Sequence, residues 1–513
     1  MYKKSLIRGT LILAAAGIVA KFLGFFFRIP LINMVGEEGI GLYQLTYPLY
    51  TFLLALAAGI PVALSKMISE RIALNRKKEA VKIFRTSILA MAIFGVISSA
   101  SLIIFSQTII HTFKWSNEAA YSLMGISLAP AFTCLLSVYR GYFQGLQIME
   151  PPAASQVMEQ IIRICIGVGL AYLLLPKGID VAAGGASFGA AAGAFIALLW
   201  MMVKYSRNRI ECIYEEKTRN SMYLFCEMLR MAIPISIGQA IGSVMALIDS
   251  IQVPGLLMSS GYSYQMATRL YGQLTGKAHV LINVPLTLSM ALAQSTVPAI
   301  SEMNAIRSLK SLHKTIHVIF KFGMVIALPC CAGLYALSRP ILMLIFQGTG
   351  DGWRLLQILS VAAVFIIIAQ VCTSILNGIG KTILPVATMC LGCIVKIIIS
   401  MAFVPVQSLN IKAAAYSTLF SYVVVALLDF IFVVKYTRVR LPFNKTFAGP
   451  AISSAMMIIS VIFVFTRIQS LSGSGNIATV LAILIGGFIY IVMLLATRTL
   501  TKDELTGIVR RGL

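Results

Sequence analysis

Long apolar runs alternate with short polar stretches along the whole chain. Most runs hold roughly 20 or more mainly apolar residues, the length that a helix needs to cross the hydrocarbon core of a bilayer. The pattern therefore predicts an all-α polytopic membrane protein with about 14 transmembrane helices. The expected spans are 9–34, 41–69, 83–110, 119–145, 153–175, 182–204, 223–256, 274–301, 313–337, 340–376, 383–405, 411–434, 446–466 and 477–497.

The polar stretches between the spans are short, and the longest holds roughly 20 residues, little beyond ordinary connections. They leave no room for an extramembrane catalytic domain, so we expect a protein that is not an enzyme. The tenth span is interrupted by the glycine-rich, turn-like run 347–352. Its first part is therefore expected to form a separate hairpin end.

The composition narrows the class of protein further. Hydrophobic residues make up 58% of the 513 residues and charged residues 12%, which excludes a cytosolic enzyme, a disordered chain and a secreted disulfide scaffold. Continuous apolar runs also disfavour an outer-membrane barrel, whose strands alternate. Most of the nine cysteines lie within apolar runs, and Cys390 and Cys393 have no second pair at zinc spacing. We expect no metal site.

The charges indicate an orientation. Lysine and arginine number 42 and acidic residues 18, giving a formal net charge of +24. In a membrane protein such an excess collects in cytoplasmic loops rather than indicating a nucleic-acid partner. If the N-terminus is cytoplasmic, 28 basic residues fall on the cytoplasmic side and 6 outside. We therefore expect a multi-pass protein of the bacterial plasma membrane with both termini in the cytoplasm.

An internal repeat appears at an offset of about 230 residues, the length of six spans with their loops. Residues 68–70 (ISE) recur as 300–302, and Lys204-Tyr205 recurs as Lys435-Tyr436. Because six spans is an even number, the two repeats have the same orientation, typical of transporters whose lobes rock about a central path. We expect a six-helix lobe at 1–220, a second at 221–440, and two appended helices with a tail at 441–513.

Four basic residues fall within predicted spans, where a charge is costly and marks a cavity or a partner. Lys21 and Arg28 are two helical turns apart and share a face of the first span, around Gly24. Arg269 and Lys277 are similarly placed at the start of the eighth. Four cations with no evident local acid predict a cavity for an anionic substrate such as a diphosphate. Snorkelling of each side chain to the interface is the alternative.

Other charges within spans have structural or coupling interpretations. Glu159 and Arg163 stand at i,i+4, which predicts a structural ion pair within one helix. Asp249 and Asp429 are acids in apolar surroundings. Either could bind a coupling cation or proton, or pair with a basic residue of its lobe, and Asp249 is the favoured coupling site.

Three segments carry a resemblance to a known family: 36–43 (GEEGIGLY), 60–66 (IPVALSK) and 140–145 (RGYFQG), the last leading into residues 149–163. They resemble the stage V sporulation protein B and polysaccharide-exporter branch of the multidrug, oligosaccharidyl-lipid and polysaccharide (MOP) superfamily. The resemblance implies 14 helices in two lobes around a V-shaped cavity. It implies flipping of undecaprenyl-diphosphate-linked sugars, above all lipid II, with membrane lipids and cell-wall synthesis enzymes as partners, for peptidoglycan or spore cortex.

The resemblance also implies roles for single residues. Residues 267–270 (ATRL) resemble the helix 8 motif of the related lipid II flippases, so Arg269 is expected to bind substrate. Residues 21–25 (KFLGF) resemble their helix 1 motif, in which an arginine stands at the place of Lys21; their second arginine falls one residue from Arg28. Some of these flippases bind sodium through a helix 7 aspartate, which Asp249 matches, but their helix 11 acid has no counterpart here. No bound cofactor is expected, and sodium, a proton or the membrane potential is the expected driving force.

Three other functions remain as alternatives. A drug or cation antiporter of the same superfamily predicts acids rather than cations in the cavity. A membrane glycosyltransferase or ligase needs catalytic loops or paired acids outside, where Glu37 and Glu38 are the one such pair. A non-transporting scaffold for cell-wall enzymes predicts that substitutions in the cavity leave function unchanged.

Overall fold

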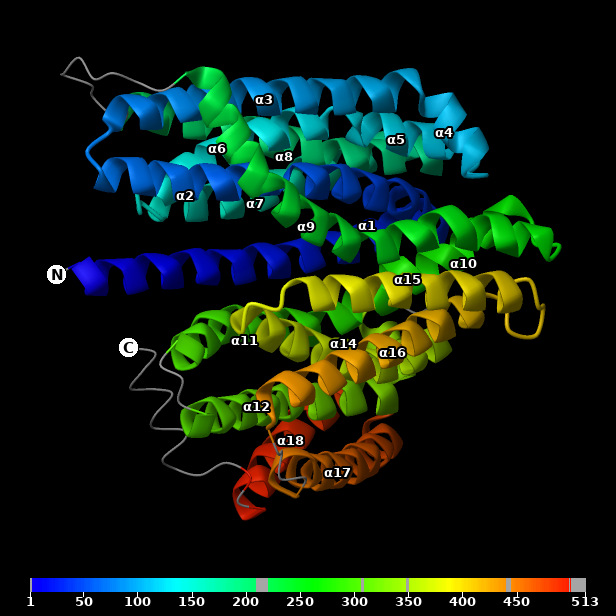
Figure 1. Ribbon diagram of the computed structural model, residues 1–513. Coiled ribbons are helices and arrows are strands. Elements are labelled where there is room, and N and C mark those ends of the chain that lie inside the picture. Colours follow the sequence, from blue (N-terminus) through cyan, green and yellow to red (C-terminus); the bar gives the residue numbers. More distant parts are fainter. Residues whose placement is uncertain are drawn as a thin grey trace. The chain divides into compact units, whose positions relative to one another are not determined.

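The computed structural model describes residues 2–208, 220–305, 309–346, 350–439, 444–497 and 499. Within these ranges all regular secondary structure is helical, and twelve helical segments are long and apolar enough to cross a membrane (Figure 1). The prediction of an all-α polytopic membrane protein is confirmed. One segment, Ala15–Ala73, has 59 residues and would be about 90 Å long if straight, enough for two crossings. The segments are therefore consistent with the roughly 14 spans predicted.

The helices form two compact units, Met1–Gly272 and Gln273–Leu513. The helices of the first unit are α1 (Tyr2–Ala57), α2 (Gly59–Ala73), α3 (Lys77–Ile104), α4 (Ser106–Thr112), α5 (Ala119–Ser127), α6 (Ala129–Gly145), α7 (Glu150–Leu174), α8 (Ile179–Arg207), α9 (Ser221–Ser259) and α10 (Tyr264–Gly272). Those of the second are a π-helical turn (Gln273–Ala278), α11 (His279–Ala305), α12 (Leu309–Ala336), α13 (Ser338–Ile345), α14 (Trp353–Gly378), α15 (Ile383–Phe403), α16 (Ile411–Thr437), α17 (Gly449–Ser472) and α18 (Gly475–Ala496).

Helix α1 contains a kink that the sequence pattern placed correctly as a break between two spans. Gly36 has φ 69° and ψ −170°, a backbone conformation outside the helical region that favours glycine. The kink folds α1 back on itself, because the rings of Phe27 and Tyr43 are 5.9 Å apart, whereas 16 residues of straight helix extend about 24 Å. The two halves of α1 thus face each other.

Helices α9 and α10 pack on α1 and α2, so the compact units divide at Gly272 rather than near residue 220, where the repeat placed the boundary between lobes. Glycines allow this close packing. A Cβ on Gly59 would meet the Ala232 carbonyl of α9, and one on Gly41 would meet the Thr268 carbonyl of α10. The lobes defined by the repeat stay a prediction.

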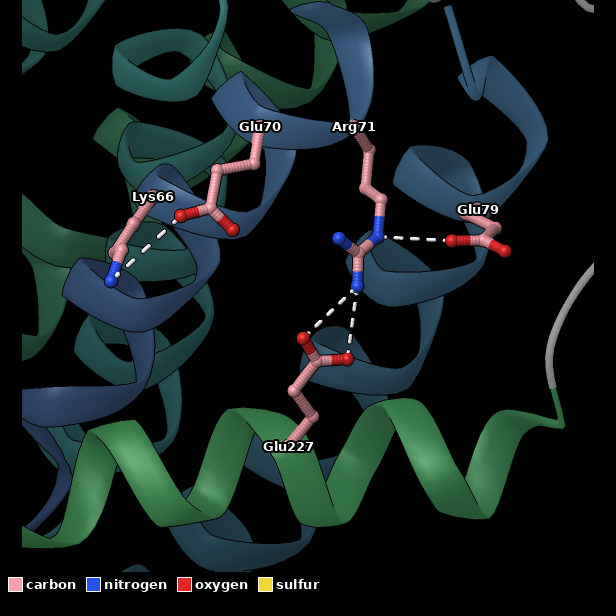
Figure 2. A network of polar contacts seen from close by, with 5 residues as sticks. All are labelled: Lys66, Glu70, Arg71, Glu79 and Glu227. Carbon is pink, nitrogen blue, oxygen red and sulfur yellow. Dashed lines mark hydrogen bonds and ion pairs between the residues drawn. The ribbon is translucent and has the colours of Figure 1, made fainter. Parts of the chain in front are cut away.

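A buried arginine also ties α9 to α2 and α3 (Figure 2). The Arg71 guanidinium of α2 lies 2.9 Å from a carboxylate oxygen of Glu79 of α3, and it donates to both carboxylate oxygens of Glu227 of α9, at 3.0 and 2.9 Å. Its neighbour pair, Lys66 and Glu70, is exposed and 3.8 Å apart. The short loop after α2 brings Arg71 and Glu79 together, so one guanidinium joins three helices.

In the second unit, α14 packs against α11, α12 and α16, and α15 packs against α16, while α17 and α18 pair with each other (Figure 1). Helix α13 ends at Ile345 and α14 begins at Trp353. The predicted interruption of the tenth span is therefore confirmed, and the first part of that span forms the separate helix α13. Residues 347–349 of the turn lie outside the described residues.

Candidate functional site

The first unit places a basic residue of α1 beside a row of tyrosines. Tyr43, Tyr47 and Tyr50, called the tyrosine cluster below, follow one another on one side of α1 beyond the kink, with successive ring centroids 5.6 and 5.8 Å apart. Arg28, half-buried on the other half of α1, lies within electrostatic reach of Tyr43 and Tyr47. Lys21, two turns earlier, is exposed. The kink at Gly36 brings the predicted cation Arg28 to the cluster.

Arg163 of α7 enters the same cluster from a different helix. Its guanidinium donates to the Tyr43 hydroxyl over 2.6 Å. It also lies over the rings of Tyr47 and Phe27, 5.1 and 5.8 Å from their centroids. These are cation–π distances. The side chain is buried, and among the described residues none accepts a hydrogen bond from its Nε. Two guanidinium groups, Arg28 and Arg163, therefore share one aromatic site.

The predicted ion pair between Glu159 and Arg163 is wrong. Glu159 instead accepts a hydrogen bond from Arg140 of α6 over 2.8 Å, and Arg140 also donates to Ser155 over 2.8 Å. The i,i+4 spacing does put Glu159 and Arg163 on one flank of α7. A neighbouring helix offers each of them a better partner: a guanidinium for Glu159 and a tyrosine hydroxyl for Arg163.

Arg269 has an acid beside it that comes from a distant part of the sequence. Its Nε donates to Oε2 of Glu37 over 2.8 Å. Glu37 directly follows the kink residue of α1 and lies 232 positions before Arg269. A Cβ on Gly272 of α10 would meet the carbonyl of Glu37, so α10 lies against the kink itself. The Arg269 side chain is 48% exposed, whereas that of Glu37 is 8% exposed.

Lys277 belongs to the second unit, in the π-helical turn between α10 and α11. It is fully buried, and its ammonium lies 5.7 Å from the centroid of the Phe346 ring. Whether Lys21, Arg28, Arg269 and Lys277 line one cavity stays a prediction.

Asp249, the favoured coupling residue, is buried in α9. It lies close enough to Tyr271 of α10 for the two groups to interact electrostatically. Trp115 donates its indole N–H to the carbonyl of the next residue, Ser250, over 2.7 Å. Asp249 thus lies where α9 meets α10, and its role in coupling remains a prediction.

The sequence did not lead us to predict the tyrosine cluster. The three tyrosines are four and then three residues apart, a spacing that places them on one helix face. This spacing is the feature of the sequence that could have indicated the cluster. An aromatic stripe at helical spacing usually packs in a core, so the spacing alone does not indicate a cation site. The backbone fold at Gly36 and the approach of α7 give the stripe its two guanidinium groups.

Comparison with known proteins identifies the family. A family model described as polysaccharide biosynthesis protein matches residues 6–304. The chain belongs to this polysaccharide biosynthesis protein family. The matched region covers the first unit from residue 6 onward, including both arginines at the tyrosine cluster, Arg269 and Glu37.

Two proteins of Bacillus subtilis (strain 168) are similar to this chain over nearly their whole length. Stage V sporulation protein B is 29% identical, covering 99% of this chain and 98% of the relative. Lipid II flippase MurJ is 25% identical, covering 95% and 94%. A solved structure of lipid II flippase MurJ in an inward closed conformation superposes with a TM-score of 0.71 at 16% identity, covering 94% of this chain and 98% of that one. The likeness supports a shared fold.

Proposed function

We propose that this protein flips a lipid-linked anionic sugar precursor across the bacterial plasma membrane by alternating access. The undecaprenyl-diphosphate-linked precursor lipid II is the substrate we propose, for peptidoglycan or spore cortex. The full-length similarity to proteins named stage V sporulation protein B and lipid II flippase MurJ supports this function.

The observation that carries the proposal is the pair of arginines at the tyrosine cluster. Among the residues that the structure describes, neither Arg28 nor Arg163 has a carboxylate within 4.0 Å of its guanidinium. The recorded partners of Arg163 are a neutral hydroxyl and two aromatic rings. Two guanidinium groups without acidic partners within apolar helices suit an anion with several oxygens, because arginine binds phosphate oxygens in pairs.

In this proposal the diphosphate binds at Arg28 and Arg163, with Lys21 and Arg269 guiding the head group, and the polyprenyl chain stays in lipid. Lys277 is a proposed further contact in another conformation. An inside-negative potential favours outward movement of an anion by about 2.3 kcal/mol per charge for each 100 mV. A coupling cation at Asp249 is a second source of driving force. Both termini lie in the cytoplasm, and cell-wall synthesis enzymes use the product outside.

The experiment uses cells depleted of their own lipid II flippase and expressing this chain. An added enzyme that cleaves lipid II exposed on the outer leaflet gives the readout. Restored cleavage that is lost with Arg28→Gln supports a flippase with a cationic site. Absence of cleavage despite confirmed membrane insertion contradicts lipid II as substrate. Cleavage that persists at the wild-type level in Arg28→Gln contradicts the cationic site.

A further inference from the structure

Asp429 of α16 lies buried between three helices of the second unit. Its Oδ1 is 2.6 Å from the Thr388 hydroxyl of α15, and its Oδ2 accepts from the Thr373 hydroxyl of α14 over 3.1 Å. Along α16, Val425 and Ala426 pack into one apolar cluster a turn before it, and Val433 packs into another a turn after it. The carboxyl thus meets two hydroxyls within an otherwise apolar shell.

If Asp429 is ionised, the Thr388 hydroxyl has two acceptors beside it but one hydrogen to donate. The hydroxyl lies 2.6 Å from Asp429 and 3.0 Å from the carbonyl of Pro385, and both neighbours act as acceptors when Asp429 is ionised. A hydroxyl has one hydrogen to donate. If Asp429 carries a proton on Oδ1, it donates to Thr388, and Thr388 donates to Pro385. Both contacts are then hydrogen bonds.

The charges around Asp429 favour the same state. Within the described ranges, no lysine, arginine or histidine nitrogen lies within 4.0 Å of this carboxyl. The titratable group beside it is the buried thiol of Cys372 on α14. On α15, Lys396 is eight residues from Thr388, or about 12 Å along the helix. On α12, His313 contacts the carbonyl of Thr437, two turns beyond Asp429.

We propose that Asp429 is a proton-binding site, un-ionised in the conformation described here. On insertion scales an ionised carboxylate at the centre of a membrane-spanning helix costs about 2.5–3.5 kcal/mol. Asp429 lies in the candidate span Ile411–Thr437, and a proton removes its charge. A hard metal cation such as Ca²⁺ takes roughly six to eight oxygen ligands, whereas two hydroxyls of the described residues bond to this carboxyl. On release the Oδ1–H bond breaks, its electron pair stays on the carboxylate, and the proton passes to water.

Infrared spectroscopy of the full chain in lipid nanodiscs at neutral pH tests the protonation state without any substrate. The wild type is expected to show the carbonyl band of an un-ionised carboxylic acid, and Asp429→Asn is expected to lose that component. Asp351→Asn, at an exposed acid of the same unit, is the matched control and keeps it. Thr388→Val, which removes the acceptor of the proposed hydrogen bond, keeps the band but shifts its frequency. An identical band in wild type and Asp429→Asn, or a sodium-dependent carboxylate band in its place, overturns the proposal.

Use of this proton in transport rests on the proposed function and needs a separate measurement. In proteoliposomes, a one-unit pH gradient is expected to shift the steady-state distribution of lipid II by about tenfold for one proton per cycle, and Asp429→Asn removes the shift. Equal shifts in wild type and variant overturn the coupling role. If the wild type moves no lipid II, the proposed function fails, while the infrared result still decides the proton site.

Discussion

Arg269 donates from Nε to Oε2 of Glu37 over 2.8 Å, joining α10 to the residue that follows the kink in α1. The Arg269 side chain is 48% exposed and that of Glu37 is 8% exposed. The pair therefore joins α10 to the kink of α1, with the carboxylate buried and the arginine side chain partly exposed. In the proposed function Arg269 also contacts the substrate head group.

Arg269→Ala is expected to reduce lipid II flipping by at least about tenfold, because a hydrogen bond to a charged group contributes about 1.5–3 kcal/mol. Glu37→Gln keeps the shape and removes the competing charge, so flipping is expected to persist with equal or tighter substrate binding. Flipping and binding in proteoliposomes provide the measurement. A loss as large in Glu37→Gln as in Arg269→Ala would show that the pair acts through structure alone.

Arg140 and Glu159 are expected to behave as one energetic unit. Arg140→Gln leaves the largely buried Glu159 carboxylate without its guanidinium, and breaking a buried pair costs roughly 3–5 kcal/mol. Glu159→Gln is expected to restore much of the thermal stability lost in Arg140→Gln. In an Arg163→Gln background, Glu159→Gln is expected to restore none of the lost thermal stability. Thermal melting of the four purified variants measures these differences in stability. If Glu159→Gln restored the stability of Arg163→Gln, the result would support an ion pair between Glu159 and Arg163 instead.

The buried and the exposed ion pairs of Figure 2 predict losses of different size for similar substitutions. Arg71→Gln removes a guanidinium that is 7% exposed from Glu79 and Glu227, and a loss of roughly 3 kcal/mol or more is expected. Lys66→Gln breaks a pair whose side chains are 63% and 44% exposed, and exposed pairs contribute less than about 1 kcal/mol. Thermal unfolding in detergent is the measurement, and equal losses in the two variants would contradict the three-helix joint.

Gly59→Ala is expected to disrupt the packing of α9 on α2, because the added Cβ would meet the backbone carbonyl of Ala232. The matched control is Gly242→Ala on α9, where a Cβ would have nothing within 4 Å. That variant is expected to keep or slightly raise stability, since alanine favours a helix by about 1 kcal/mol over glycine. Yield of folded protein and melting temperature report the difference, and wild-type behaviour of Gly59→Ala would rule out the close approach.

The apolar pattern predicts the helices well because crossing a membrane imposes length and hydropathy on each segment separately. The break near Gly36 followed from the gap between two apolar runs, and the break at 347–352 from a glycine-rich run. Partners of charges could not be predicted in the same way. Glu37 precedes Arg269 by 232 residues, and Arg140 precedes Glu159 by 19, so these pairs depend on which helices pack together.

The role of Arg163 shows the same limit. Its spacing from Glu159 favoured a local pair, and nothing in the sequence indicated that α1 would fold back and present Tyr43 to it. The candidate cations Lys21, Arg28 and Arg269 could be selected because charges in apolar spans are rare. Their surroundings required the fold.

Flipping of lipid II by the purified protein in proteoliposomes tests the central claim most directly. Wild-type protein is expected to move lipid II between leaflets, and Arg28→Gln and Arg163→Gln are each expected to lower the rate by at least about tenfold while remaining folded. Arg467→Gln, at a basic residue of α17 in the second unit, is the control and keeps the wild-type rate. Equal rates in wild type, Arg28→Gln and Arg163→Gln would contradict the account that the two arginines at the tyrosine cluster bind the diphosphate.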